Sequence, residues 1–456
     1  MYTGYRDLPE AAKRAQTSVR SRVPSFVWGL GIVSLLTDAS TEMVGSTLPL
    51  YLSTWLRVGP IALASVDATQ HAVTAIMRVG SARLADRTRR LRAASLIGYV
   101  TSFGARVALL FGAPTTSFVA GTVVVDRFGK GVRTGPRDAL IANGTPPDAL
   151  GAAFGRHRAL DAAGAFLGPL LAYLILRSTH STGFRTVFAV AALLGGLGVA
   201  ALMLLVPSRV AGVHSGASGE GFDVVAARRS AWPSTRPISG HNVSPEAATS
   251  SEVLRATVGA TRTRPPWRLL IVAGTVGMCT VGDALVLIIL LRSAHLSGST
   301  FPLLAVATSV AFAVFAGPFG RAADRLGSTR VFRFGTLVLA GTYLVMGARI
   351  PTGALAVSGV LLAIGVSYAA TDGVLAALVA RVASTGSAAT AQASVQTATS
   401  LGRAVGSAAF GVLWARRGAG FGFKVFGVAM IAATAWCFVI DRSRPLDRSQ
   451  PLDDED

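Results

Sequence analysis

The sequence predicts an all-α membrane protein with twelve transmembrane helices arranged as two six-helix halves. The composition, the recurrence of long apolar stretches and an internal repeat support this prediction. Of 456 residues, 51% are hydrophobic and only 14% are charged, whereas soluble domains contain about 25% charged residues. We therefore expect most of the chain to lie in a lipid bilayer.

Apolar stretches of about 20 residues recur along the chain, and each is long enough to cross ~30 Å of hydrocarbon. Stretches such as SLIGYVTSFGARVALLFG have no polar face at helical spacing, which argues against a large soluble helical core. The predicted spans are 25–56, 61–85, 93–112, 115–135, 153–177, 184–206, 267–291, 301–322, 331–349, 352–382, 389–415 and 421–440.

Residues 207–266 separate the first six spans from the last six. They are rich in Ser, Gly, Pro and Arg, a composition that cannot bury a core, so we expect a disordered linker. The predicted organisation is an N-terminal segment (1–24), a first six-helix half (25–206), the linker (207–266), a second six-helix half (267–441) and a tail (442–456).

The two halves share sequence features at one offset. RLADR at 83–87 matches RAADR at 321–325, and the same shift of 238 residues relates Gly164 to Gly402. Parallel six-helix repeats are typical of one large class of secondary transporters, whose substrate sites lie near the bilayer midplane between the halves. The repeat therefore predicts a transporter.

The formal net charge of +20 would suggest nucleic-acid binding in a soluble protein. Here the arginines crowd the linker, the segment before the first span and alternate loops thereafter. By the positive-inside rule these segments and both termini face the cytoplasm. We expect a multi-pass protein of the cytoplasmic membrane, without a cleaved signal peptide because the first 24 residues are polar.

Two loops carry a recognisable charged motif. ARLADRTRRLR and GRAADRLGSTR resemble the G-x-x-x-D-R-x-G-x-R-R signature of the major facilitator superfamily, although Ala82 and Arg89 replace both glycines in the first copy. The resemblance implies a twelve-helix transporter fold in which these loops gate the cytoplasmic side. The motif residues are Asp86, Arg87, Arg90, Gly320, Asp324, Arg325 and Gly327.

The fifth predicted span contains Gly155, Gly164, Gly168 and Pro169 at the spacing G-x8-G-x3-G-P. This spacing resembles the antiporter motif of drug–proton exchangers in that superfamily and favours export. Small residues four apart also let any two membrane helices approach closely, so helix packing remains an alternative. The string DRFGKGVRTGPRDALIA also resembles a poorly characterised bacterial branch with no single defining substrate.

The same string places Arg133 at the end of the fourth predicted span and Arg137 and Asp138 just after it. We expect these residues to form a charged interface with Asp86 across the cytoplasmic helix ends, which we call the cytoplasmic latch. FGKGVRT lacks the G-x-x-x-x-G-K-[ST] spacing of a phosphate-binding loop.

Charged residues inside the spans are costly and should face a partner or a water-filled cavity. Asp38 and Glu42 lie one turn apart in the first span. Two carboxylates so close repel each other, which favours a proton on one of them and suits proton coupling. The alternative is a static ion pair with Arg78, His71 or Arg106.

The second span carries Asp67, His71 and Arg78 on one face. A histidine that only pairs with Asp67 is the alternative to a proton relay. The resemblance implies that helices one, four, seven and ten line the cavity, whereas Asp161 is an isolated acid of helix five. The proton-coupling and cavity candidates are Asp38, Glu42, Asp126, Arg127, Asp161, Asp283 and Asp372.

The favoured function is a secondary active transporter of a small molecule, a proton-coupled exporter that works by alternating access. An importer of the same fold, or a sensor or scaffold without transport activity, remains an alternative. The sequence shows no nucleotide-binding motif, nucleophile–base pair or cluster of metal ligands, so we expect no enzyme, cofactor or metal. The expected partners are the substrate, protons and the lipid bilayer, without nucleic acid, and we expect a monomer.

Overall fold

The computed structural model describes residues 23–87, 90–146, 149–179, 183–207, 267–382 and 388–443. These residues form helices and no strands, in the order the apolar spans predict. The predicted N-terminal segment, most of the linker and the tail lie outside the described residues. The first half contains α2 (Ser25–Leu50), the π-helix η1 (Tyr51–Trp55), α3 (Pro60–Arg87), α4 (Leu91–Phe111), α5 (Thr116–Asn143), α6 (Leu150–Ser178) and α7 (Gly183–Leu205).

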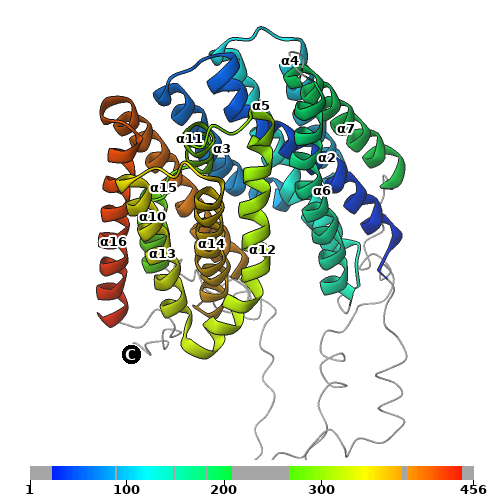
Figure 1. Ribbon diagram of the computed structural model, residues 1–456. Helices are drawn as coiled ribbons and strands as arrows, with labels where there is room; N and C mark the ends of the chain where they lie inside the picture. Colours follow the sequence, from blue (N-terminus) through cyan, green and yellow to red (C-terminus); the bar gives the residue numbers. More distant parts are fainter. Residues whose placement is uncertain are drawn as a thin grey trace, which may run out of the picture. The chain divides into compact units, whose positions relative to one another are not determined.

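The second half repeats the plan with one helix broken in two (Figure 1). The described helices thus account for the twelve predicted spans, and the all-α membrane fold is confirmed. The second half contains α10 (Trp267–Met278), α11 (Asp283–Ser293), the short 3-10 helix η3 (Gly298–Thr300), α12 (Phe301–Leu326), α13 (Ser328–Ala348), α14 (Ala354–Val382), α15 (Ala388–Arg417) and α16 (Ala419–Ser443).

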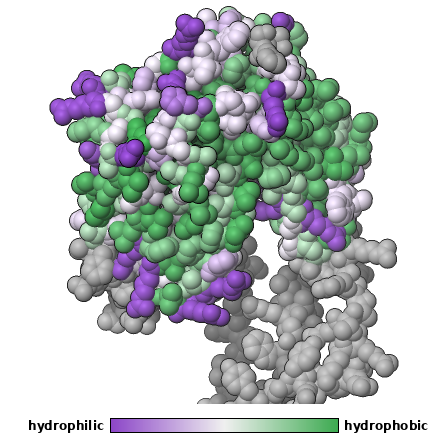
Figure 2. Space-filling view, viewed as in Figure 1, coloured by the Kyte–Doolittle hydropathy of each residue, from purple (hydrophilic) through white to green (hydrophobic). Residues whose placement is uncertain are grey.

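Within the described ranges, 8 spanning segments are long and apolar enough to cross a membrane. The remaining spans are α2 with η1, α3, α5 and α15, which carry the charged and hydroxyl side chains discussed below. Figure 2 shows hydrophobic side chains over the middle of one face and hydrophilic ones towards its ends. The chain is therefore a multi-pass membrane protein, and its most polar helices need protein or water as neighbours.

The fourth helix is longer than the sequence predicted. The predicted span ended at residue 135, before Pro136, but α5 continues to Asn143 with this proline in its interior. A proline normally kinks or ends a helix because it lacks a backbone N–H. Here Arg133 and Arg137, on either side of the proline, both pair with acids inside the protein. The basic string is thus part of a helix that continues past the predicted end of the span.

The seventh span is interrupted at residues 279–282, where the sequence predicted a continuous helix. The backbone N–H of Val281 donates to the hydroxyl of Tyr343 on α13 at 3.0 Å, instead of to a helical carbonyl. Non-helical backbone is tolerated at membrane depth only where protein satisfies its polar groups. The break gives α11 a free N-terminus within the span, which begins with Asp283.

Glycines of the fifth span bring α6 against α2. A Cβ at Gly164 would collide with the backbone of Leu35, and one at Gly168 would collide with the carbonyl of Ala39. Pro169 lies inside the same helix. Close backbone approach through small residues is a common way for membrane helices to pack. The packing role of these two glycines is therefore observed, whereas a role in antiport stays a prediction.

The second half uses the same packing at the repeated positions. A Cβ at Gly402 would collide with the carbonyl of Gly274 on α10, and Gly406 is equally confined against α10. By contrast, Gly155, the first residue of the predicted motif, faces open space. The repeat seen in the sequence is thus a repeat of helix contacts, α2 with α6 and α10 with α15.

The two halves contact each other mainly through α3 with α15 and α6 with α12 (Figure 1). Arg292, at the end of α11, donates to the backbone carbonyl of Ser53 in η1 at 3.2 Å. Gly411 on α15 has no room for a Cβ because Ala64 on α3 lies against it. These contacts lie near the α2–α3 and α15–α16 connections, at the end opposite residues 207 and 267. At this end the halves are closed against each other.

Candidate functional site

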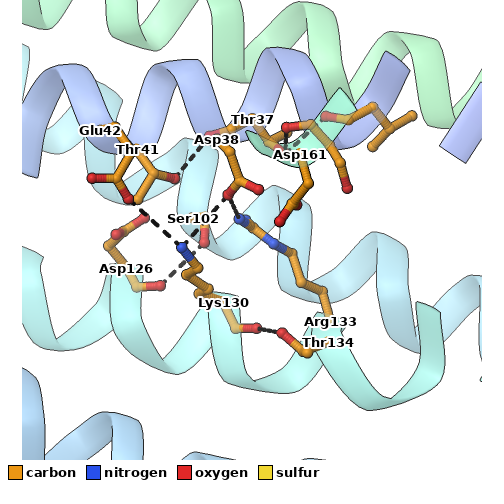
Figure 3. Close-up of polar contacts among 12 residues, drawn as sticks. Thr37, Asp38, Thr41, Glu42, Ser102, Asp126, Lys130, Arg133, Thr134 and Asp161 are labelled. Atoms are coloured by element: carbon orange, nitrogen blue, oxygen red, sulfur yellow. Dashed lines mark hydrogen bonds and ion pairs between the residues drawn. The ribbon is translucent and has the colours of Figure 1, made fainter. Parts of the chain in front are cut away.

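A cluster of charges joins α2 and α5 in the first half. The Nζ of Lys130 lies 3.5 Å from Oδ1 of Asp38, and Arg133 reaches the same oxygen at 3.6 Å (Figure 3). Asp38 and Arg133 are both buried, and the Arg133 guanidinium also lies 4.6 Å from the ring centroid of Tyr99. The sequence proposed Arg78, His71 or Arg106 as partners of Asp38, and that assignment is wrong. The two cations compensate the buried carboxylate, since an unpaired charge at this position would be costly.

Glu42 lies one turn beyond Asp38 and shares its lysine. Its carboxylate is 3.9 Å from the Nζ of Lys130, and its side chain is 37% exposed. Lys130 is itself 36% exposed, so the ammonium lies between a buried acid and an accessible one. A single cation facing two acids can move from one to the other when either gains a proton.

Asp161 belongs to the same cluster, although the sequence suggested an isolated acid. It projects from α6 towards Asp38 (Figure 3), and its carboxylate lies 3.8 Å from Arg137. Arg137 also pairs with Asp138 at 2.9 Å and donates to the hydroxyl of Ser34 at 3.3 Å. Three helices thus contribute to one network, which we call the Asp38 cluster: Asp38, Glu42, Lys130, Arg133, Arg137 and Asp161.

A second ion pair lies next to this cluster. Arg106 on α4 donates to Asp126 on α5 at 3.0 Å and to Thr41 on α2 at 2.6 Å. Only 3% of the Arg106 side chain is exposed. Arg127, the next residue on α5, donates to the amide oxygen of Gln70 on α3 at 2.9 Å.

The interface between the halves contains the polar face predicted on α3. The hydroxyl of Ser407 on α15 donates to Asp67 at 2.6 Å, and His71 lies 3.8 Å from the same carboxylate oxygen. A Cβ on Gly282, at the break before α11, would collide with the Asp67 carboxylate. Arg78 reaches Ser400, also on α15, at 3.5 Å. The predicted pair of Asp67 with His71 is present. In addition, the carboxylate of Asp67 and the guanidinium of Arg78 each contact a serine of α15 in the other half.

Loss of the Ser407 hydroxyl should loosen this interface. Hydrogen bonds to charged groups contribute about 1.5–3 kcal/mol, so Ser407→Ala should shift the population towards separated halves by roughly tenfold or more. Cysteine labelling in detergent measures the shift. Ser53 is buried at the closed end, so a cysteine introduced at this position should react faster when Ser407 is replaced by alanine than when Ser407 is present. Ser400→Ala is the matched control on the same helix, because its bond at 3.5 Å is longer. Equal labelling rates in Ser407→Ala and Ser400→Ala would contradict the role of the Ser407–Asp67 hydrogen bond in holding the halves together.

The second half carries two polar pairs of its own. Arg403 on α15 pairs with Asp372 on α14 at 3.0 Å. The hydroxyl of Tyr368 on α14 donates to Asp283, the first residue of α11, and the Arg403 guanidinium lies 5.3 Å from the centroid of the Tyr368 ring. Asp283 and Asp372, predicted as cavity acids, therefore each have a partner within the second half.

The predicted cytoplasmic latch is only partly described. The side chains of Asp86 and Arg87 lie outside the described residues, and Arg90, Asp324 and Arg325 are exposed. Gly327 ends α12 with φ of 94°, a conformation that favours glycine, and Gly320 has open space around its Cα. Arg133 and Arg137 pair with acids of the Asp38 cluster, so any contact with Asp86 is additional to these pairs.

Several contacting residues were not selected from the sequence. Lys130 is one of three lysines in the chain, and this scarcity was the only available signal. Gln70, Tyr368 and Ser407 are ordinary polar residues of membrane helices, and their role depends on neighbours distant in sequence. Among the described residues, no group of three or more His, Cys, Asp or Glu side chains could hold a metal ion.

The sequence profile of the Major Facilitator Superfamily matches residues 30–291 and 269–454. The chain belongs to this superfamily. Its family and fold are those of transporters, not of enzymes. This major facilitator protein is 34% identical over 173 residues to an uncharacterized MFS-type transporter of Methanocaldococcus jannaschii, a match that covers 38% of this chain and 42% of the relative.

A further relative is an uncharacterized protein of Mycobacterium tuberculosis, 33% identical over 181 residues, or 40% of this chain and 43% of that protein. The matches thus span less than half of each relative's length. Among solved structures, the nucleoside transporter NupG superposes with a TM-score of 0.66 at 12% identity, covering 91% of this chain and 99% of that one.

A POT family transporter in complex with 5-aminolevulinic acid superposes with a TM-score of 0.70 at 13% identity, covering 91% and 96% of the two chains. A bacterial homologue of the human lysosomal transporter Spinster, in an inward-facing and unoccupied conformation, gives 0.67 at 16% identity, with 94% and 98% covered. At these identities the similarity establishes the major facilitator fold alone.

Proposed function

We propose that this major facilitator protein is a proton-coupled secondary transporter that exports a small molecule by alternating access. The observation that carries the proposal is the Asp38 cluster, in which buried Asp38, accessible Glu42 and Asp161 compete for Lys130, Arg133 and Arg137. Acids within the membrane are functional by default, because they are costly to keep there. A scaffold has no need of them.

Proton binding at Asp38 would change the contact between α2 and α5. The carboxylate holds Lys130 at 3.5 Å only while it is charged. Once it is protonated, the ammonium is free to pair with Glu42. Release of the proton on the other side of the membrane restores the original pair. Antiport follows if the substrate binds only while Asp38 is deprotonated, so that the proton and the substrate exclude each other.

Export and orientation follow from the remaining sequence features. The glycine spacing of α6 resembles that of drug–proton exchangers and supports export. The arginine-rich connections support a cytoplasmic location for both termini and the linker. The cytoplasmic latch, which includes Asp86, would then close the cytoplasmic ends of the helices together with Asp324 of the second half. One chain contains both halves and suffices as a monomer.

Proteoliposomes test the function directly. Addition of a transported compound on one side should drive protons in the opposite direction, detected with a trapped pH-sensitive dye. Proton movement in the same direction as the compound would indicate an importer. Substrate flux without proton movement would contradict coupling, and the absence of flux for a chemically broad panel would favour a sensor or scaffold.

The orientation makes a separate prediction. Cysteines introduced into 207–266, with Cys279 and Cys437 replaced by serine, should not react with an impermeant maleimide applied outside intact cells. Permeabilised cells should label fully, which serves as the positive control. Labelling from outside would show that the linker faces the extracellular side and would contradict the predicted orientation.

A further inference from the structure

Arg127 is a cation of α5 that has no carboxylate within 4.0 Å among the described residues, unlike its neighbours on the same helix. Arg106, Lys130, Arg133 and Arg137 each have an acid within 4.0 Å. Arg127 instead donates to a neutral acceptor, the amide oxygen of Gln70, at 2.9 Å, and its buried Nε has no partner. An arginine inside a membrane protein needs a counter-charge or water. Arg127 therefore has capacity for an anionic group.

Asp283 is the complementary case in the second half. It is exposed although it lies inside the seventh span, and its described partner is the hydroxyl of Tyr368, again a neutral group. Arg403, whose guanidinium lies over the Tyr368 ring, is paired with Asp372 at 3.0 Å. Asp283 therefore has capacity for a cationic group.

These two charges belong to opposite halves and are linked through α3. Gln70, which accepts from Arg127, lies one turn from Asp67, and the Asp67 carboxylate lies against Gly282, the residue before Asp283. Arg127 lines a cavity of the first half together with Gln70 and Thr41, and Asp283 begins α11 at the break that contacts α3. A ligand between the halves can therefore reach both groups.

We propose that the transported compound is a small zwitterion whose carboxylate binds Arg127 and Gln70 and whose ammonium group binds Asp283 and Tyr368. A molecule with both charges would neutralise both residues at once, whereas a molecule with one charge would leave the other residue uncompensated. This inference rests on the proposed transport function and names its substrate class.

Neighbouring contacts position each end of the binding site. The amide oxygen of Gln70 accepts from Arg127, which orients the Gln70 NH2 group to donate to a carboxylate beside the guanidinium. On the other side Arg403, at 5.3 Å from the ring centroid, holds the Tyr368 ring and so its bond to Asp283. Because the two ends lie on different halves, a bound zwitterion would draw the halves together.

Thermal stabilisation of the purified full-length protein tests the class with matched probes. The zwitterions are 5-aminolevulinic acid, 6-aminohexanoic acid and glycylglycine, which differ in the distance between their charges. Each is compared with an analogue without the ammonium group and with its uncharged ester or amide. At least one zwitterion should raise the melting temperature and bind about 10- to 100-fold more tightly than both of its analogues.

Two variants test which residue binds the carboxylate and which binds the ammonium group of the zwitterion. Arg127→Gln should remove the preference for the acid over its ester, and Asp283→Asn should remove the preference for the amine over its des-amino analogue. Arg177→Gln, at the exposed end of α6, should bind as the unmodified protein does. If a variant does not fold, the probe series on the unmodified protein still decides the question.

The inference is overturned if no zwitterion stabilises the protein, or if single-charge analogues bind as tightly as the zwitterion. Its failure is distinct from failure of the proposed function. Zwitterion binding without proton movement in proteoliposomes would refute coupling alone. Proton-coupled flux of a compound with a single charge or none would refute the zwitterion alone.

Discussion

Asp38→Asn is expected to abolish substrate accumulation driven by a pH gradient, while substrate binding and downhill exchange persist. Asparagine keeps the shape of the side chain but can neither bind a proton nor hold a charge against Lys130 at 3.5 Å. The cation would then pair permanently with Glu42, the acid 3.9 Å away. A transporter locked in this pairing should exchange substrate without moving protons.

Parallel measurement of proton and substrate flux in proteoliposomes checks this expectation. Glu42→Gln should lower the coupled rate without abolishing it, because Asp38 still binds Lys130. Size-exclusion profiles of both variants show whether each remains folded, since Arg133 also loses a partner in Asp38→Asn. Retained coupling in Asp38→Asn would move the site elsewhere, with Asp126 and Asp161 the next candidates.

The sequence was sufficient for the fold because the bilayer imposes a simple rule on spanning segments. Apolar length identified all twelve spans, and the offset between Gly164 and Gly402 identified the repeat that the helix packing confirms. The errors fell where tertiary contacts override local signals. Pro136 marks a helix end by composition, but ion pairs on both sides keep α5 helical. The break after Met278 contains Gly282 as its only local signal, and the hydroxyl of Tyr343 accepts the hydrogen bond of the Val281 N–H there.

The candidate site was predicted by residue type but not by partner. The position of an acid inside a predicted span indicated that it needs a polar or charged partner, and each of four such acids has one: Asp38, Asp67, Asp126 and Asp161. Which neighbour each one has depends on helix rotation and depth, and one sequence contains neither. Asp161, an apparently isolated acid on the fifth span, therefore proved to face Arg137 and to project towards Asp38 (Figure 3).

Arg106→Met should cause the largest loss of stability among single substitutions in the spans. Arg106 is 3% exposed and binds Asp126 at 3.0 Å and Thr41 at 2.6 Å. Removing one partner of a buried ion pair leaves an uncompensated charge and costs about 3–5 kcal/mol. We expect a marked drop in melting temperature in detergent and a smaller folded fraction after purification. Arg177→Met, at an exposed helix end, should change stability by no more than about 0.5 kcal/mol.

The double variant Arg106→Met with Asp126→Asn separates charge burial from packing. If the penalty comes from the orphaned Asp126 carboxylate, neutralising that group should recover most of the lost stability, and the two changes should be strongly non-additive. If methionine simply fits the site badly, the double variant should be as unstable as the single one. If the double variant regains stability but does not transport, the Arg106–Asp126 pair links α4 to α5 and also contributes to the transport path beside Arg127.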